Sequence, residues 1–159
     1  MRLSRVGYDN CIGFIDGGVD AWKHAGNATS SILSITADEF SGKLSNSTVD
    51  VLDVRKPGEY ESSHLCSVNS NPLDFITDWK DSLSKEKEYH IHCAGGYRSM
   101  IAASILKRNG YEKLVDVAGG FGAIQKTNAK IVTTACKTEE AKKAQTKTSF
   151  FSRLFSKKL

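Results

Sequence analysis

An alternation of strand-like and helix-like segments between residues 36 and 127 constrains the fold of this chain more than any other feature. Apolar, β-branched runs predict strands, and apolar residues spaced three or four positions apart predict helices. In chain order the expected elements are a helix at 35–44, a strand at 48–55, a turn with one helical turn at 56–65, a weak strand at 67–73, a helix at 72–83, a strand at 88–93, a helix at 98–110, a strand at 113–117 and a helix from 119. Short links between alternating strands and helices favour an α/β fold, with a parallel central sheet and helices on both faces.

An internal repeat relates residues 5–22 to residues 108–124. Both segments carry the frame R-x-G-Y-acidic, an apolar run, Gly-Gly and an alanine, with one residue of slip. Each predicts the end of a helix, a short strand, a Gly-Gly turn and a new helix. Because so short a unit buries too little surface to fold alone, we expect residues 1–26 to be the C-terminal remnant of a preceding, related domain. The alternative is coincidence between two similar units.

Composition and charge divide the rest of the chain. The small, polar residues 27–34 predict a linker, residues 35–136 the main domain, and residues 137–159 a basic amphipathic tail. The tail holds seven Lys or Arg against two Glu, a charge of +5, so the remainder of the +4 chain sums to −1. The basic balance therefore belongs to the tail and gives no support for nucleic-acid binding by the main domain.

The tail and the termini bear on membranes and on location. No apolar run approaches the roughly 20 residues of a membrane-spanning helix, and the N-terminus lacks a signal-peptide pattern. Residues 149–159 place four apolar side chains on one stripe beside basic residues, which suits a membrane-surface or partner-binding helix, or a helix packed on its own domain. The four cysteines, Cys11, Cys66, Cys93 and Cys136, form no CxxC pair, so we expect free thiols in a reducing cytoplasm.

Cys93 is the strongest candidate for chemistry, because it ends the strand at 88–93 and precedes a helix. Gly95 and Gly96 allow successive backbone N–H groups to point inward, the helix N-terminus adds partial positive charge, and Arg98 adds a full one. Each effect favours the reactive thiolate. The alternative is a buried structural cysteine beside a helix start.

The chain resembles a rhodanese domain over most of its length. The segments ITADEF, VLDVRKPGEYESSHL, VNSNPL, HIHCAGGYRSMIAASIL and GYEKLVDVAGGFGAI occur in the order that such a domain shows. Four residues separate Cys93 from Arg98, the loop length of rhodanese sulfurtransferases, whereas the related cysteine phosphatases have five. The sequence departs from the family at Ser63-His64-Leu65 and Cys66-Ser67, which puts a local turn in doubt more than the chemistry.

The resemblance implies a rhodanese-like fold and a sulfurtransferase that needs no cofactor or metal. Cys93 would be the nucleophile that carries sulfane sulfur as a persulfide, from a donor such as thiosulfate to a thiophilic acceptor. The backbone amides of Ala94, Gly95, Gly96, Tyr97 and Arg98 would hold the outer sulfur, and Arg98 would attract an anionic donor. Asp53 and Arg55 would form an ion-pair network, with a catalytic role as the alternative.

The sequence of residues 92–111 is most similar to the C-terminal rhodanese domain of certain fusion proteins. In these proteins a metallo-β-lactamase-fold domain is fused to rhodanese repeats, and the group is related to persulfide dioxygenases. The expected partners are therefore small sulfur-containing anions or persulfides and an upstream domain of that kind. Two other functions stay open: a sulfur carrier or interaction module with little turnover, and a cysteine phosphatase. We also weigh a zinc site at His64, Cys66, His90 and His92, and a Cys–His dyad of Cys93 with His92, but neither has the required spacing. Cys66 and Cys136 are either inert or resolving thiols.

Overall fold

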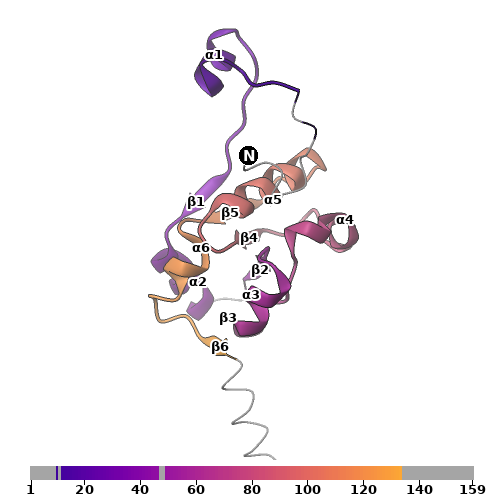
Figure 1. The fold of residues 1–159 in the computed structure, drawn as a ribbon. Helices are drawn as coiled ribbons and strands as arrows, with labels where there is room; N and C mark the ends of the chain where they lie inside the picture. The colour runs from indigo at the N-terminus through magenta and orange to yellow at the C-terminus, as the bar shows by residue number, and fades with distance from the viewer. Residues whose placement is uncertain (1–9, 11, 47–48, 134–159) are drawn as a thin grey trace, which may run out of the picture.

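The computed structural model describes residue 10 and residues 12–46 and 49–133, and its centre is a parallel sheet between two layers of helices (Figure 1). The strands run in the order β1-β5-β4-β2. Their bounds are β1 (Leu33–Ile35), β2 (Asp50–Asp53), β4 (Tyr89–His92) and β5 (Leu114–Val117). The three neighbouring pairs are all parallel. The prediction of an α/β fold with a parallel central sheet is confirmed.

The two central strands are buried along their whole length. All four residues of β4 and all four of β5 are buried, as expected for strands covered on both faces. In register, Ile91 pairs with Asp116 and His92 pairs with Asp53. The carboxyl ends of β2 and β4 therefore lie side by side, and the loops after them share one edge of the sheet.

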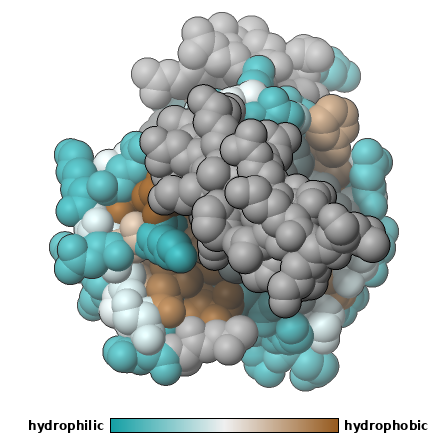
Figure 2. Space-filling view, turned by 90° about the horizontal axis from the view of Figure 1, so that it is seen from below, coloured by the Kyte–Doolittle hydropathy of each residue, from teal (hydrophilic) through white to brown (hydrophobic). Residues whose placement is uncertain are grey.

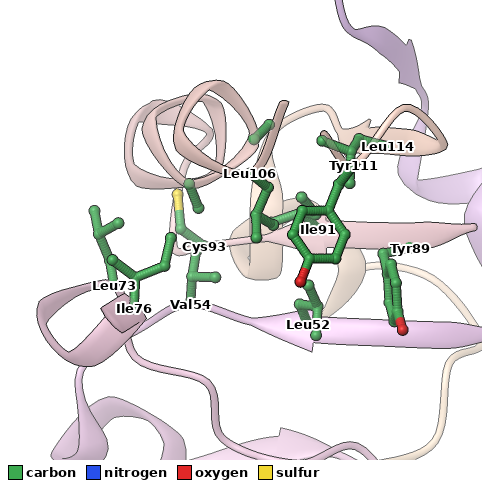
Figure 3. Close-up of a cluster of buried hydrophobic side chains, with 12 residues drawn as sticks. Leu52, Val54, Leu73, Ile76, Tyr89, Ile91, Cys93, Leu106, Tyr111 and Leu114 are labelled. Atoms are coloured by element: carbon green, nitrogen blue, oxygen red, sulfur yellow. The ribbon is translucent and has the colours of Figure 1, made fainter. Parts of the chain in front are cut away.

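One face of the sheet is covered by α5 (Tyr97–Arg108) and α4 (Ile76–Trp79). The core on this face contains Leu52, Val54, Leu73, Ile76, Tyr89, Ile91, Cys93, Ala102, Ala103, Leu106, Tyr111 and Leu114 (Figure 3). The two alanines are fully buried, so α5 approaches the strands closely.

The other face is covered by α2 (Ala37–Asn46) and α6 (Gly120–Ile124), with α3 (Pro57–Ser62) beside them. Phe40, Leu65, Phe121 and Ile124 are the largest buried side chains of this second core. Helix α2 begins in a full capping box, because the Glu39 carboxylate accepts the Thr36 N–H at 2.8 Å and the Thr36 hydroxyl accepts the Glu39 N–H at 3.2 Å.

Two predicted elements are shorter than the sequence pattern indicates. The expected strand at 67–73 is a single parallel bridge between Ser70 and Asp53. The expected helix at 72–83 is broken into α4 and two flanking 3₁₀ turns, η2 (Leu73–Phe75) and η3 (Lys80–Ser82). Side chains compete for main-chain carbonyls here: the Trp79 indole donates to Pro72 O and the Ser82 hydroxyl to Trp79 O.

Three short strands were not predicted. The expected linker at 27–34 overlaps β1, which exists because it pairs with β5 at the sheet edge. The segments β3 (Ser63–Leu65) and β6 (Ile131–Thr133) pair antiparallel in a separate two-stranded sheet. All three strands have three residues, too few for a period-two pattern to stand out in the sequence.

The N-terminal end of the described chain leaves the central domain. Helix α1 (Gly18–His24) has no buried residue and projects away from the other elements in Figure 1. Cys11, Cys136 and the predicted tail at 137–159 lie outside the described residues. Seen from below, hydrophilic residues form most of the outline and hydrophobic patches lie between them (Figure 2). Among the described helices, none combines the length and apolar character needed to cross a membrane.

Candidate active site

Cys93 lies directly after β4, at the start of a loop that leads into α5. We call residues 93–98 the Cys93 loop. Gly96 takes a φ of 105°, a conformation that favours glycine, and the helix starts at the next residue. The thiol points toward α5 and lies next to Val54, Leu73 and Ile76 (Figure 3). The residue is 1% exposed, so only a small group can reach the sulfur without a movement of the loop.

The first turn of α6 holds the base of the Cys93 loop in place. The Phe121 N–H donates to Cys93 O at 2.7 Å, and the Gly122 N–H donates to Ala94 O at 3.1 Å. Gly120 lies so close that a Cβ there would be 2.4 Å from Cys93 O, and its φ is 56°. A side chain at position 120 would therefore push the loop out of place.

Hydrogen-bonding groups surround the sulfur. The Gly96 N–H donates to Cys93 Sγ at 3.1 Å, and the thiol donates to Ser99 Oγ, which lies 3.7 Å away. Burial raises the pKa of the Cys93 thiol, but hydrogen bonds from the Ser99, Gly95 and Gly96 backbone and from the Ser99 side chain outweigh burial. The net pKa is below the ordinary thiol value. The site therefore favours the thiolate, the nucleophilic form of cysteine.

Arg98 does not point its charge at the sulfur alone, because Glu59 of α3 binds it with both carboxylate oxygens. Arg98 Nη1 donates to Glu59 Oε2 at 2.6 Å, and Nη2 donates to Oε1 at 2.8 Å. The Arg98 hydrogen bonds lower the pKa of Glu59 to about 2. The carboxylate is thus ionised at neutral pH and offsets the positive charge that the sequence assigned to the loop.

A second arginine–carboxylate pair lies deeper, behind the Cys93 loop. Arg55 Nη2 donates to Asp53 Oδ2 at 2.6 Å, and both side chains are buried. The Arg55 guanidinium also lies 3.7 Å from the centre of the Phe121 ring. This is the ion-pair network expected for Asp53 and Arg55, and its depth speaks against direct contact with a substrate.

The structure brings most of the predicted site residues together. Cys93, Ala94, Gly95 and Gly96 form one turn around the sulfur. The backbone donors that affect the thiol come from Gly95, Gly96 and Ser99 rather than from all five expected amides. Tyr97 begins α5 with 48% of its surface exposed, and Arg98 turns to Glu59.

Sequence reasoning missed two site residues, Ser99 and Glu59. Ser99 is fully buried, and its hydroxyl donates to Gly96 O at 3.0 Å, which braces the loop. The serine that follows the arginine in CAGGYRS was the available signal. Glu59 lies 39 positions before Arg98, and no local pattern indicated the pairing.

The histidines do not form the alternative sites. His92 lies beside Asp53 and the Phe121 ring, whereas Cys93 packs in the core on the opposite face of the sheet. His64 stacks on Tyr60. In the part of the chain that the structure describes, no three His, Cys, Asp or Glu side chains gather in a geometry that would bind a metal.

Comparison with known proteins agrees with this geometry. The model of the rhodanese-like domain family matches residues 36–127. The "Putative sulfur carrier protein YrkF" of Bacillus subtilis is 33% identical over 100 residues, which cover 62% of this chain and 54% of that protein, about half its length. "Thiosulfate sulfurtransferase GlpE" of Tolumonas auensis is 25% identical over 92 residues, which cover 58% of this chain and 87% of that protein.

Solved structures show the same architecture. A crystal structure of a rhodanese-like domain protein from Staphylococcus aureus superposes with a TM-score of 0.58 and is 35% identical. The match covers 64% of this chain and all of that one. The family match spans three of the four strands of the parallel sheet, the Cys93 loop and both helical layers, so the chain belongs to the rhodanese-like domain family.

Proposed function

We propose that the protein is a sulfurtransferase that carries sulfane sulfur on Cys93. The environment of the Cys93 thiol carries this proposal. The thiol is nearly buried, and backbone hydrogen bonds lower its pKa. It begins a loop in which four residues separate Cys93 from Arg98. Sulfurtransferases and a sulfur carrier among the similar proteins support the same chemistry.

Two displacements complete the reaction. The Cys93 thiolate attacks the outer sulfur of a donor such as thiosulfate, the donor's S–S bond breaks, and sulfite leaves with the electron pair. The N–H groups of Gly95, Gly96 and Ser99 face the sulfur site and stabilise its negative charge. A thiophilic acceptor such as cyanide then attacks the outer sulfur, the persulfide bond breaks, and the Cys93 thiolate returns.

Incubation with thiosulfate and cyanide tests the proposal. We expect thiocyanate to form and intact-mass spectrometry to show one added sulfur atom when cyanide is left out. Cys93→Ser should abolish both signals. Cys66→Ser is the matched control, because Cys66 is a free but exposed cysteine outside the Cys93 loop, and it should keep both. Wild-type protein that takes up no sulfur would refute the proposal.

A sulfur carrier with little turnover is the second candidate, and the name of the YrkF relative favours it. A carrier would load one sulfur on Cys93 but would form thiocyanate only slowly after the first turnover. A cysteine phosphatase is the weakest candidate, because the loop is one residue shorter than the phosphatase pattern and the sulfur is buried. Cys93-dependent hydrolysis of p-nitrophenyl phosphate would revive it.

We also propose that residues 1–26 are the end of a preceding rhodanese-like repeat. The turn geometry supports this: Gly17 and Gly18 have φ values of 75° and 61°, and Gly119 and Gly120 have 75° and 56°. The exposure of apolar side chains also supports it. When the two Gly-Gly turns are aligned, four exposed side chains of the first unit (residues 1–26) match four buried side chains of the second unit (residues 108–124). In order, the exposed side chains are Ile12, Ile15, Val19 and Trp22, and their buried counterparts are Leu114, Val117, Phe121 and Ile124.

A fusion supplies the test of this arrangement. Residues 27–111 of the chain would be joined directly ahead of Asn10, so that the first unit completes the added copy. We expect the Trp22 fluorescence to shift to shorter wavelength and to resist acrylamide quenching, in a background where Trp79→Phe in both copies removes the other tryptophans. A Val19→Asp substitution should reverse the shift. Trp22 that stays as accessible as in the original chain would refute the proposal.

The sequence resemblance supports two further parts of the proposal. The longer protein would include a metallo-β-lactamase-fold domain upstream, and small sulfur anions or persulfides would be the substrates. It would work in a reducing cytoplasm, since Cys66 and Cys93 are both free thiols. The longer sequence from the source organism would test the upstream domain, and fractionation of its cells would test the cytoplasmic location.

A further inference from the structure

The charge beside the Cys93 loop is set by Glu59. Arg98 is the only charged side chain in the loop, and both of its terminal nitrogens donate to the Glu59 carboxylate. Asp74, in η2, also interacts electrostatically with Arg98 and raises its pKa further. Two carboxylates thus act on one guanidinium, Glu59 through two hydrogen bonds and Asp74 only through a weaker electrostatic interaction.

Glu59 is held in place by its own helix. Its carboxylate accepts the Lys56 N–H at 3.0 Å, half of a capping box at the start of α3. Its carbonyl accepts Arg55 Nη1 at 3.4 Å, and Arg55 is fixed by the buried Asp53. The carboxylate therefore reaches Arg98 from a fixed backbone, and moving it requires breaking the helix cap as well as the ion pair.

This arrangement affects sulfur donors differently. Thiosulfate carries two negative charges, and it must either compete with Glu59 for Arg98 or approach a site where Glu59 already neutralises the arginine. A persulfide with one ionisable group meets less repulsion, and its outer sulfur still reaches the same backbone N–H groups. The amide donors bind the transferred sulfur in both cases, so the carboxylate acts on the rest of the donor.

We propose that Glu59 is a positioning and specificity-determining residue, which holds Arg98 and thereby weakens the binding of dianionic donors relative to donors with one charge. The proposal rests on the sulfurtransferase function above. It assigns no bond-making step to Glu59, which acts through Arg98.

Glu59→Gln tests the proposal with little risk to the fold, because glutamine at this position of a capping box still accepts the Lys56 N–H. Donor kinetics would be compared for thiosulfate and mercaptoethanol persulfide with cyanide as acceptor. We expect the KM for thiosulfate to fall about fivefold, the effect of one half-exposed ion pair, and the ratio of kcat/KM for thiosulfate over persulfide to rise by a similar factor. Glu59→Asp, which keeps the charge, should restore part of the original ratio.

The rise in the ratio of kcat/KM for thiosulfate over persulfide must depend on Arg98 being released from Glu59. A double variant with Glu59→Gln and Arg98→Met should therefore not show this rise. Glu112→Gln is the charge-matched control, because this substitution removes the same formal charge at a distant position. Glu112 follows the far end of the 12-residue α5. A ratio that does not rise in Glu59→Gln, or that rises equally in the double variant, would overturn the proposal.

A binding measurement separates this proposal from the proposed function. Sulfate, an unreactive dianion, would be titrated against the alkylation of Cys93 by uncharged iodoacetamide, with the modified peptide identified by mass. We expect Glu59→Gln to need about fivefold less sulfate for half-protection. If protection shifts in this way but no sulfur is transferred, the sulfurtransferase function is refuted and the role of Glu59 in anion binding stands. If protection is the same in both proteins, the role of Glu59 is refuted.

Discussion

Arg55 and Arg98 each pair with a carboxylate, but the two pairs differ in their surroundings. Asp53 and Arg55 have side chains 0% and 4% exposed, and the guanidinium also lies against the Phe121 ring. Glu59 and Arg98 are 37% and 19% exposed and lie beside the Cys93 loop. Geometry alone does not separate them, since both have a 2.6 Å contact. Burial makes the first pair a part of the fold and leaves the second accessible to substrates.

The largest expected difference between the pairs is in stability. Asp53→Ala leaves the Arg55 charge buried without its partner, which should lower the free energy of unfolding by about 3–5 kcal/mol. Urea unfolding at pH 7 measures the loss. Asp50→Ala is the matched control, because its partner Lys87 and Asp50 itself are about half exposed, and it should change stability by about 1 kcal/mol or less. Equal losses in the two variants would mean that burial does not distinguish these pairs.

The surroundings of the buried pair should also make the protein sensitive to mild acid. Burial lowers the pKa of His92, next to Asp53, and of His90 on the same strand. Since the unfolded state binds these protons first, stability is complete above about pH 6.5, the unfolded pKa, and is lost as the pH falls below it. Urea unfolding at pH 7 and pH 5 should therefore show lower stability at pH 5. A variant with His90→Asn and His92→Asn should show a smaller difference between the two pH values.

The accessible pair should respond only to much stronger acid. Because Arg98 lowers the pKa of Glu59 to about 2 from 4.5, its stabilising contribution is present above pH 4.5 and is lost as the pH falls toward 2. NMR titration of the Glu59 carboxyl carbon should give a midpoint near 2. Arg98→Met should move that midpoint up toward 4.5, and a midpoint that stays low in this variant would assign the shift to the Lys56 N–H instead.

The smallest expected effect is the coupling energy within the accessible pair. A double-mutant cycle of Glu59→Gln and Arg98→Met should give about 0.2–1 kcal/mol, because water competes for both groups and solvent screens them. Thermal or urea unfolding of the four proteins measures this energy. A coupling of about 3 kcal/mol would show that the pair holds α3 to the domain and is not a site for substrates.

The sequence predicted the elements whose patterns are local and long. The strands at the centre of the sheet could be found because apolar residues recur along them. They alternate with histidines in Tyr89–His92, and only Asp116 interrupts them in Leu114–Val117. The edge strand Leu33–Ile35 and the β3–β6 pair could not be found, because three residues fix no period and each strand depends on a distant partner. The helix expected at 72–83 was interrupted by side-chain hydrogen bonds that only the folded chain makes.

The same distinction applies to the candidate site. The Cys93 loop could be predicted because its cysteine, glycines and arginine are contiguous. The partner of Arg98 could not, since Glu59 reaches it only after α3 and α5 have been placed by the sheet. Sequence spacing predicted Cys93 as the candidate nucleophile, and long-range packing placed the Glu59 carboxylate on the arginine beside it.

The contact between the α6 turn and the Cys93 loop also bears on the order of events during synthesis. The loop receives the Phe121 and Gly122 N–H groups, which lie 28 positions after Cys93 and Ala94 respectively. A ribosome adding about 5–20 residues per second makes them only seconds after the cysteine. Until that turn has left the ribosome and folded back, the loop lacks these two supports. The nascent chain therefore completes the surroundings of the Cys93 thiol only when nearly the whole domain has been made.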